Sequence, residues 1–132
     1  MRILIVDDEP HIRRLLATRL TAEGFEVAEA SNGEDGLESI EEIPPDLVLL
    51  DLMMPGANGL EVLSRIRSRP EHGGKPGIIL TAKGQDTDRE LALAGGATDF
   101  VTKPFSPMKL LSRIREILET PPPPSDGAPA LP

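Results

Sequence analysis

The sequence of 132 residues contains no cysteine, so it forms no disulfide and offers no thiolate for a zinc site. It also lacks tryptophan and tyrosine and has only three phenylalanines, which leaves few flat side chains for stacking nucleic acid bases. Positive charge is scarce: 14 Lys and Arg against 22 Asp and Glu give a formal net charge of -8. Because binding to a nucleic acid backbone needs a basic face, we expect no direct binding of DNA or RNA by this chain.

Long apolar runs are missing as well. A membrane-spanning helix needs about 20 consecutive apolar residues, and no run in this sequence approaches that length. The N-terminus does not resemble a secretory signal peptide. We therefore expect no membrane association and a cytoplasmic location. The length fits one domain that can bury a core without disulfides or metals.

Short apolar runs of strand length alternate with helical patterns along the chain. Four runs are mainly apolar, as in strands of a parallel sheet buried on both faces: residues 3–6, 47–50, 78–80 and 100–102. Residues 25–30 alternate in the manner of a half-buried strand. Helical patterns cover residues 10–23 and 86–94, and three more helices begin after Asn32, after Asn58 and at Ser106-Pro107. The expected inner faces of the first and last helices carry Ile12, Leu15, Leu16 and Leu20, and Leu110, Leu111, Ile114, Ile117 and Leu118, respectively.

Five strand–helix units joined by right-handed crossovers predict an α/β fold, namely a three-layer, doubly wound (βα)5 structure around a parallel five-stranded sheet. The first strand must be central, because its neighbours supply residues to the same edge. The expected strand order is therefore 2-1-3-4-5, which is flavodoxin-like. Residues 1–120 are expected to form this domain. Residues 121–132 hold six of the 14 prolines and are expected to be a flexible tail or the start of a linker.

Polar side chains stand where separate apolar runs end. Asp7 and Asp8 follow the first run, and Asp51, Thr81 and Lys103 follow three others. In open sheets of this kind, ligands bind outside the carboxyl ends of the strands, so these residues should meet at one edge. Two carboxylates 4 Å apart repel by roughly 4 kcal/mol at an effective dielectric of about 20. Three of them favour a bound cation, and hard oxygen ligands suit Mg²⁺ or Mn²⁺.

Asp51, alone on its strand end, can then act as a nucleophile on phosphorus and form an aspartyl phosphate. Phosphoryl transfer requires charge to be neutralised on the transferred oxygens, which the Lys103 ammonium and the Thr81 hydroxyl can do. Taken singly, each residue has a plainer explanation. A strand-end Asp usually caps a helix, a lone Thr is usually structural, and a lone Lys is usually solvated. Their combination on four separate strands favours a functional site.

Four stretches of the sequence resemble the receiver domains of response regulators, the chemotaxis-protein-like domains of bacterial two-component signalling systems. The stretches read ILIVDDE at residues 3–9, DLVLLDLMMPG at 46–56, LTA at 80–82 and KPF at 103–105. The resemblance covers residues 2–120. It implies that Asp51 accepts a phosphoryl group from the phosphohistidine of a sensor histidine kinase or phosphotransfer protein.

The resemblance also implies roles for the other residues at this edge. Asp8 and Asp51 would bind Mg²⁺ directly, Asp7 through water, and the backbone carbonyl of Met53 would be a further ligand. Thr81 and Lys103 would contact the phosphoryl group, and Phe100 would change rotamer in step with Thr81. The domain would be a phosphoacceptor and not an enzyme with a turned-over substrate, although it would assist its own phosphotransfer and slow dephosphorylation. Phosphorylation would switch a face made of the fourth helix, fifth strand and fifth helix toward an effector protein or domain.

Two rival functions fail on particular residues. A phosphatase of the haloacid dehalogenase type needs a second Asp two residues after the nucleophile, where this chain has Met53. A flavin-binding electron carrier needs a phosphate-binding first loop, and Asp7 and Asp8 would repel phosphate there. One alternative stays open, which is a receiver-like protein-interaction module that works without phosphorylation.

The oligomeric state and the output also stay open. In the winged-helix branch of the family, charged residues on the output face form a dimer. Here Asp99 and Arg113 can still pair, but Arg89 and Lys109 are both basic where that branch usually has opposite charges. We therefore expect a monomer or a weak phosphorylation-dependent dimer. The sequence does not indicate whether an effector domain follows the tail.

Overall fold

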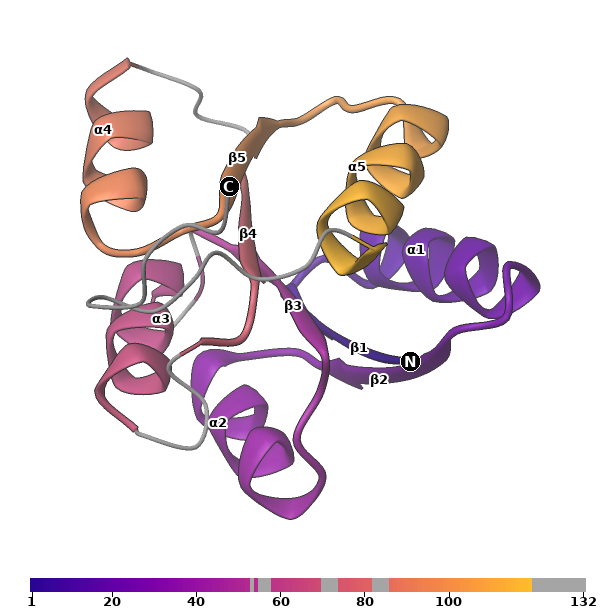
Figure 1. Ribbon diagram of the computed structural model, residues 1–132, viewed down its shortest axis with the longest axis horizontal. Coiled ribbons are helices and arrows are strands. Elements are labelled where there is room, and N and C mark those ends of the chain that lie inside the picture. Colours follow the sequence, from indigo (N-terminus) through magenta and orange to yellow (C-terminus); the bar gives the residue numbers. More distant parts are fainter. Residues whose placement is uncertain (53, 55–57, 70–73, 82–85, 120–132) are drawn as a thin grey trace, which may run out of the picture.

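The computed structural model describes residues 1–52, 54, 58–69, 74–81 and 86–119 (Figure 1). These residues form ten elements, in the order β1 (Arg2–Val6), α1 (Pro10–Ala22), β2 (Glu26–Ala30), α2 (Gly33–Glu42), β3 (Leu47–Asp51), α3 (Gly59–Ser68), β4 (Gly77–Thr81), α4 (Asp86–Ala94), β5 (Asp99–Thr102) and α5 (Pro107–Glu119). Each predicted strand and helix is confirmed, with small shifts at the ends. None of these helices is both long and apolar enough to cross a membrane. The predicted tail, residues 121–132, lies outside the described residues.

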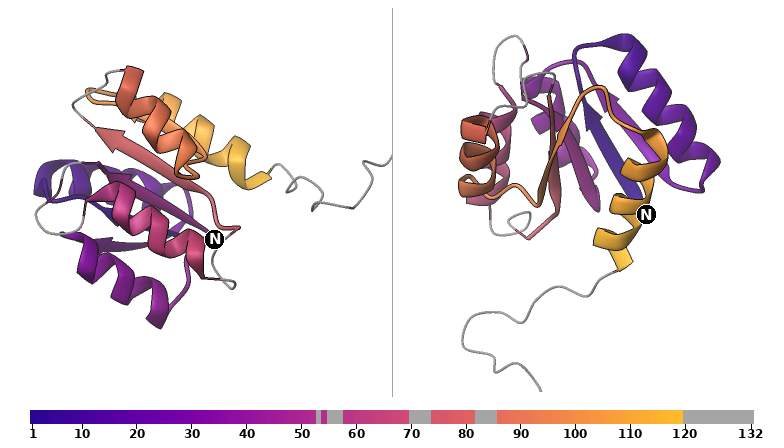
Figure 2. Two further views of the ribbon diagram at one scale, coloured as in Figure 1. Left: turned by 90° about the vertical axis from the view of Figure 1, so that its left-hand side faces the viewer. Right: turned by 90° about the horizontal axis from the view of Figure 1, so that it is seen from above.

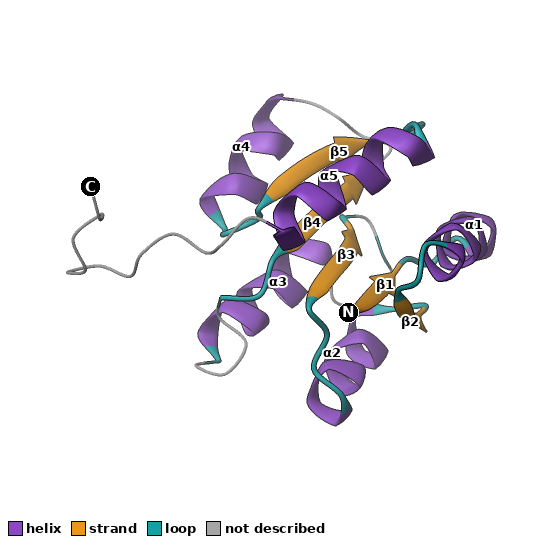
Figure 3. Cartoon of the chain, turned by 45° about the vertical axis from the view of Figure 1, so that its right-hand side comes forward, coloured by secondary structure: helices purple, strands orange, loops and turns teal. Residues whose placement is uncertain are grey.

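All neighbouring strands are parallel, and they lie in the predicted order β2-β1-β3-β4-β5 (Figure 3). The register aligns the ends of four strands. Val6 pairs with Leu50, Leu50 with Ile79, and Ile79 with Phe100. The residues that follow these positions therefore come out at one edge of the sheet, which is where the sequence places its polar side chains.

The helices cover the sheet in two layers. α1 and α5 lie on one face, and α2, α3 and α4 lie on the other (Figures 1 and 2). Alternate strand residues pack toward each layer. The α1/α5 side buries Ile3, Ile5, Leu47, Leu49, Leu16, Leu20, Leu110 and Ile114. The opposite side buries Leu4, Val6, Val48, Leu50, Val62, Leu63, Ile66 and Ala92. The apolar stripe of α5 is confirmed as core, because its other three members, Leu111, Ile117 and Leu118, are packed against the first of these clusters.

One core assignment in α1 was wrong. Leu15 is 44% exposed, whereas Leu16 and Leu20 are each 2% exposed. Ile12, Leu16 and Leu20 follow one another at intervals of four residues and form a single row along the helix. Leu15 precedes Leu16 by about 100° of helical rotation, which turns it away from the sheet.

Two glycines allow close packing where a Cβ would collide. Gly36 lies in the interior of α2, where glycine costs up to about 1 kcal/mol relative to alanine. A Cβ at this position would lie 2.9 Å from the side chain of Val6. Gly59 begins α3, and a Cβ there would overlap the backbone carbonyl oxygen of Asp51. Since backbone cannot move aside as a side chain can, Gly59 is required for α3 to start directly against the end of β3.

We predict that Gly59→Ala lowers the free energy of unfolding by about 2 kcal/mol, because overpacking a tight contact typically costs this much. Chemical denaturation measures the change. Gly74→Ala is the matched control, since nothing lies within 4 Å of a Cβ at Gly74 and its φ is not positive. Equal stability of the two variants would show that α3 does not depend on this contact.

Candidate functional site

The edge formed by the carboxyl ends of the strands gathers the polar residues that the sequence singled out. Among the described residues, the buried polar or charged ones are Asp7, Asp51 and Thr81, exposed to 0%, 4% and 0%. Asp7 follows β1, Asp51 ends β3 and Thr81 ends β4. The Lys103 side chain, which follows β5, is only 8% exposed. Asp8 is exposed at the same edge. All five residues thus lie at the ends of their strands or just beyond them, on the carboxyl edge of the sheet.

The Lys103 ammonium lies among carboxylates. Its Nζ is 2.8 Å from Asp7 Oδ2, 3.5 Å from Asp51 Oδ2 and 3.6 Å from Glu9 Oε1. Burial alone would lower the pKa of Lys103, but the hydrogen bond to Asp7 and the charges of Asp51, Asp7 and Glu9 outweigh it, so the pKa is raised. The stabilisation from this pairing is present below the ordinary lysine pKa of about 10.4 and is lost as the pH rises through the raised value. Lys103 is thus a fixed positive charge at neutral pH.

Asp7 is held from several directions. Its Oδ1 accepts a hydrogen bond from the backbone N–H of Glu9 at 2.8 Å, and its Oδ2 accepts the one from Lys103. Its own N–H donates to the carbonyl of Ala30, which ties the end of β1 to β2. The helix that follows has Glu9 as its N-cap, without a side-chain capping bond. Neither Asp7 nor Asp8 is therefore the N-cap of α1, which removes the plainer explanation for Asp8.

Backbone hydrogen bonds fix the ends of β3, β4 and β5 relative to one another. The N–H of Leu52 donates to Leu80 at 2.9 Å, which holds the chain just beyond Asp51 against β4. The N–H of Lys103 donates to the carbonyl of Thr81 at 2.7 Å. These bonds place the Asp51, Thr81 and Lys103 side chains on neighbouring strand ends.

The three carboxylates can share one cation. Asp7, Asp8 and Asp51 each offer an oxygen, and these oxygens all lie within 4.8 Å of one another. Among the described residues, the carboxylates of Asp7, Asp8, Asp51 and Glu9 outnumber the Lys103 ammonium, and this excess of negative charge favours a divalent ion. A donor set made only of carboxylate oxygens suits Mg²⁺, which prefers hard oxygen ligands and retains water. The backbone carbonyl of Met53, predicted as a further ligand, lies outside the described residues.

Phe100 lies beneath the edge. It is 6% exposed and belongs to the core cluster that includes Ala92 and Ala97. Phe100 pairs with Ile79, two residues before Thr81 along β4. It is thus separated from the carboxylate cluster but shares the β4–β5 pair with Thr81.

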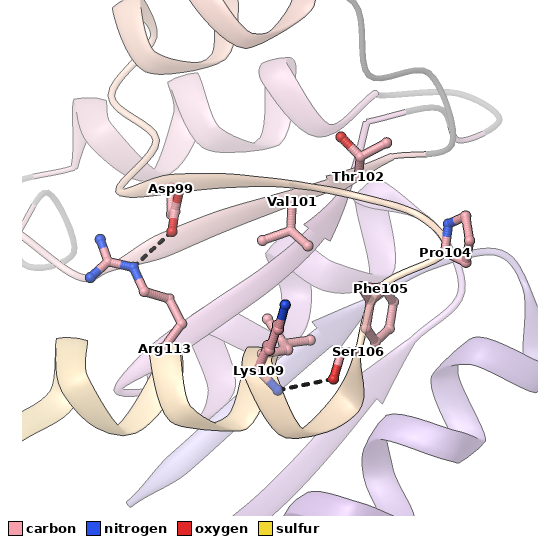
Figure 4. A pocket seen from close by; sticks show the side chains of 9 residues that line it. Asp99, Val101, Thr102, Pro104, Phe105, Ser106, Lys109 and Arg113 are labelled. Atoms are coloured by element: carbon pink, nitrogen blue, oxygen red, sulfur yellow. Dashed lines mark hydrogen bonds and ion pairs between the residues drawn. The ribbon is translucent and has the colours of Figure 1, made fainter.

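A pocket of about 460 Å³ opens between β5 and α5 (Figure 4). Thr102 and Pro104, the two neighbours of Lys103 in the chain, contribute to its wall. Asp99 and Arg113 line the other end, and the Arg113 Nε donates to Asp99 Oδ2 at 2.7 Å. This pair, which the sequence allowed, is confirmed. Its hydrogen bond raises the pKa of Arg113, and burial only partly opposes the effect.

Sequence reasoning missed two contributors to the site. Glu9 contacts Lys103, and the Arg13 guanidinium donates to the carbonyl of Asp7 at 2.8 Å. Glu9 extends the acidic pair Asp7-Asp8, and that run was the available signal. Arg13 lies four residues after Glu9, one helical turn into α1, and this spacing could have indicated that it points back to the loop.

Comparison with known protein families gives a match to the response regulator receiver domain over residues 3–115. The chain is 45% identical over 114 residues to the DNA-binding response regulator MtrA of Mycolicibacterium smegmatis, and the aligned residues cover 86% of this chain and 49% of MtrA. It is 46% identical over 116 residues to the transcriptional regulatory protein SrrA of Staphylococcus aureus, covering 88% of this chain and 47% of SrrA. The chain therefore spans about half the length of these relatives.

Solved structures show the same similarity. The BeF3-activated N-terminal receiver domain of RstA from Klebsiella pneumoniae superposes with a TM-score of 0.84 at 33% identity, covering 91% of this chain and 100% of that one. A response regulator receiver domain protein from Methanospirillum hungatei gives a TM-score of 0.84, also at 33% identity, covering 89% of this chain and 93% of that one. The resemblance seen in the sequence motifs is thus confirmed by the fold.

We predict that Lys103→Met lowers the free energy of unfolding in EDTA by about 3 kcal/mol, because it leaves the buried Asp7 carboxylate without its ionic partner. Urea denaturation at neutral pH measures this change. Lys109→Met removes an exposed ammonium from α5 and should shift stability by no more than about 0.5 kcal/mol. If both substitutions have the same small effect, the ammonium does not stabilise the carboxylate cluster.

Proposed function

Because the chain belongs to the response regulator receiver domain family, we propose that it accepts a phosphoryl group on Asp51 and acts as a phosphorylation switch in two-component signalling. The observation that carries this proposal is the gathering of Asp51, Thr81 and Lys103 with two further carboxylates at one sheet edge. The buried location of Asp51 beside the Lys103 ammonium supports a role in chemistry over one in solubility.

In this proposal the Asp51 carboxylate attacks phosphorus, and the bond from phosphorus to the donor's imidazole nitrogen breaks with its electron pair left on the nitrogen. Asp8 and Asp51 would bind Mg²⁺ at the edge directly, and Asp7 would do so through water. Bound Mg²⁺ supplies neutralisation of charge on the transferred oxygens. The Lys103 ammonium, which lies 3.5 Å from the Asp51 carboxylate, supplies a second positive charge beside the transferred oxygens.

The Thr81 hydroxyl donates to the bound phosphoryl group in the phosphorylated state. Thr81 is fully buried at the end of β4, so drawing its hydroxyl toward Asp51 changes packing around β4 and β5. Phe100, on the paired strand, changes rotamer in step. The aspartyl phosphate adds about -1.5 to -2 charges at neutral pH, which is sufficient to bias a two-state element.

The switching surface in this proposal is the face made of α4, β5 and α5. It contains the pocket beside Asp99 and Arg113, which adjoins Lys103 along the chain. An effector protein or domain would read this face. The relatives MtrA and SrrA are named as DNA-binding and transcriptional regulators, and this chain matches about half of each. We propose that their similarity to this chain reflects a shared phosphoryl-accepting part, with any contact to nucleic acid made elsewhere.

Upstream, the proposed partner is a sensor histidine kinase or phosphotransfer protein, and the proposed location is the cytoplasm. We propose that the domain is a monomer or a weak phosphorylation-dependent dimer. We also propose that it is a phosphoacceptor and not an enzyme that turns over a substrate. The alternative, an interaction module independent of phosphorylation, receives no support from the site, because Asp7, Asp8, Asp51, Thr81 and Lys103 are all present and adjacent.

We predict that incubation with acetyl phosphate and Mg²⁺ adds one phosphoryl group to the wild-type chain, and that EDTA or Asp51→Asn abolishes the addition. Intact-mass spectrometry measures it. Asp46→Asn is the matched control, since Asp46 precedes the same strand at its opposite end and should leave phosphorylation unchanged. Phosphorylation of Asp51→Asn to the wild-type level, or its persistence in EDTA, would refute the mechanism.

We also predict that Thr81→Ala accepts the phosphoryl group but loses most of the conformational response. Phosphorylation of the wild type should change amide hydrogen exchange across residues 86–102, and Thr81→Ala should show little change there. Thr81→Ser retains a hydroxyl and should respond as the wild type does. A full response in Thr81→Ala would show that the hydroxyl does not couple the phosphoryl group to β5 and α4.

A further inference from the structure

Arg13 connects the first turn of α1 to the carboxylate edge. Its backbone N–H donates to the carbonyl of Glu9 at 3.1 Å, so it belongs to the turn that begins the helix. Its guanidinium donates through one terminal nitrogen to the backbone carbonyl of Asp7 at 2.8 Å. Its Nε lies 3.4 Å from Glu29 Oε1 on β2. The Arg13 side chain is only 20% exposed, which is low for an arginine on a surface helix.

The carbonyl that Arg13 contacts belongs to the peptide that joins Asp7 to Asp8. A peptide unit is planar, so fixing its carbonyl oxygen also fixes the direction in which the Asp8 Cα lies. Asp7 itself is held at its N–H and at both carboxylate oxygens. Asp8 is exposed and its carboxylate must point inward to share a cation with Asp7 and Asp51.

We propose that Arg13 is a positioning residue for the magnesium site, which it serves by orienting the Asp7–Asp8 peptide. This inference rests on the proposed function, because it takes Asp7, Asp8 and Asp51 as the magnesium ligands. Glu29 holds the guanidinium from the opposite side, so the chain of contacts runs from β2 through Arg13 to the ligand-bearing loop. Groups that orient metal ligands commonly raise metal affinity by about ten- to a hundredfold.

The positive charge of Arg13 would have the opposite effect if it acted through its field alone. A guanidinium near a cation site repels the cation, so its removal would tighten Mg²⁺ binding. Orientation of the ligands predicts weaker binding after the same removal. The direction in which the Mg²⁺ affinity changes therefore separates the two roles. Removal of a residue with only a structural role would leave the Mg²⁺ affinity unchanged.

The test measures the Mg²⁺ dissociation constant by isothermal titration calorimetry, with unfolding free energy in EDTA measured in parallel. Arg13→Met keeps an unbranched apolar side chain but removes the donors, and we expect Mg²⁺ binding to weaken by about tenfold. Arg13→Lys keeps one donor for the Asp7 carbonyl and should recover part of the loss. Arg14→Met, on the exposed neighbour in α1, is the matched control and should bind Mg²⁺ as the wild type does.

Glu29→Gln removes the ion pair but leaves Arg13 in place, and it should weaken Mg²⁺ binding by a smaller factor in the same direction. It provides the same test if Arg13→Met does not fold. Tighter or unchanged Mg²⁺ binding in the folded Arg13 and Glu29 variants would overturn the positioning role. As long as the wild-type protein itself binds Mg²⁺, the proposed function would still stand. Failure of the wild type to bind Mg²⁺ would overturn both.

Discussion

Like charges gathered at one edge of a buried sheet impose the main constraint on this structure. Asp7 and Asp51 are almost fully buried, Asp8 lies beside them, and the ammonium of Lys103 contacts both buried carboxylates. Without compensation, each close pair of carboxylates would cost several kcal/mol. The arrangement is stable because one ammonium offsets part of the charge, and it leaves an excess that a divalent cation can neutralise. The same excess makes the edge responsive to a phosphoryl group.

The fold brings these groups together through the register of the strands and the close approach of two helices to the sheet. The parallel register ends β1, β3, β4 and β5 at nearly the same level, so residues distant in sequence become neighbours. Gly59 lets α3 start against the carbonyl of Asp51, and Gly36 lets α2 approach Val6 beneath the edge. The sheet core around these positions is apolar and closely packed, which keeps the polar groups at its edge in fixed relative positions.

Much of this arrangement could be predicted from the sequence, because the determining features are local. Apolar runs identified the strands, and the polar residues at their ends required a central first strand, which gave the observed order. Helices were predicted to begin after Asn32 and after Asn58, and each of these side chains accepts a backbone hydrogen bond as the N-cap. Prediction from the sequence was weaker where the role of a residue depends on its neighbours in space. Leu15 has the right chemistry for the core but the wrong helical phase. Gly36 looked unfavourable for a helix until its contact with Val6 was known. Arg13 has no motif that marks it, and its contacts with Asp7 and Glu29 depend on how α1 meets β2.

Whether Asp51 carries the phosphoryl group can be measured by locating the acyl phosphate on the chain. After phosphorylation with acetyl phosphate and Mg²⁺, reduction with borohydride converts an aspartyl phosphate to homoserine, which peptide fragmentation by tandem mass spectrometry assigns to a position. We expect homoserine at position 51. Homoserine at the position of Asp7 or Asp8, or at a carboxylate away from this edge, would contradict it.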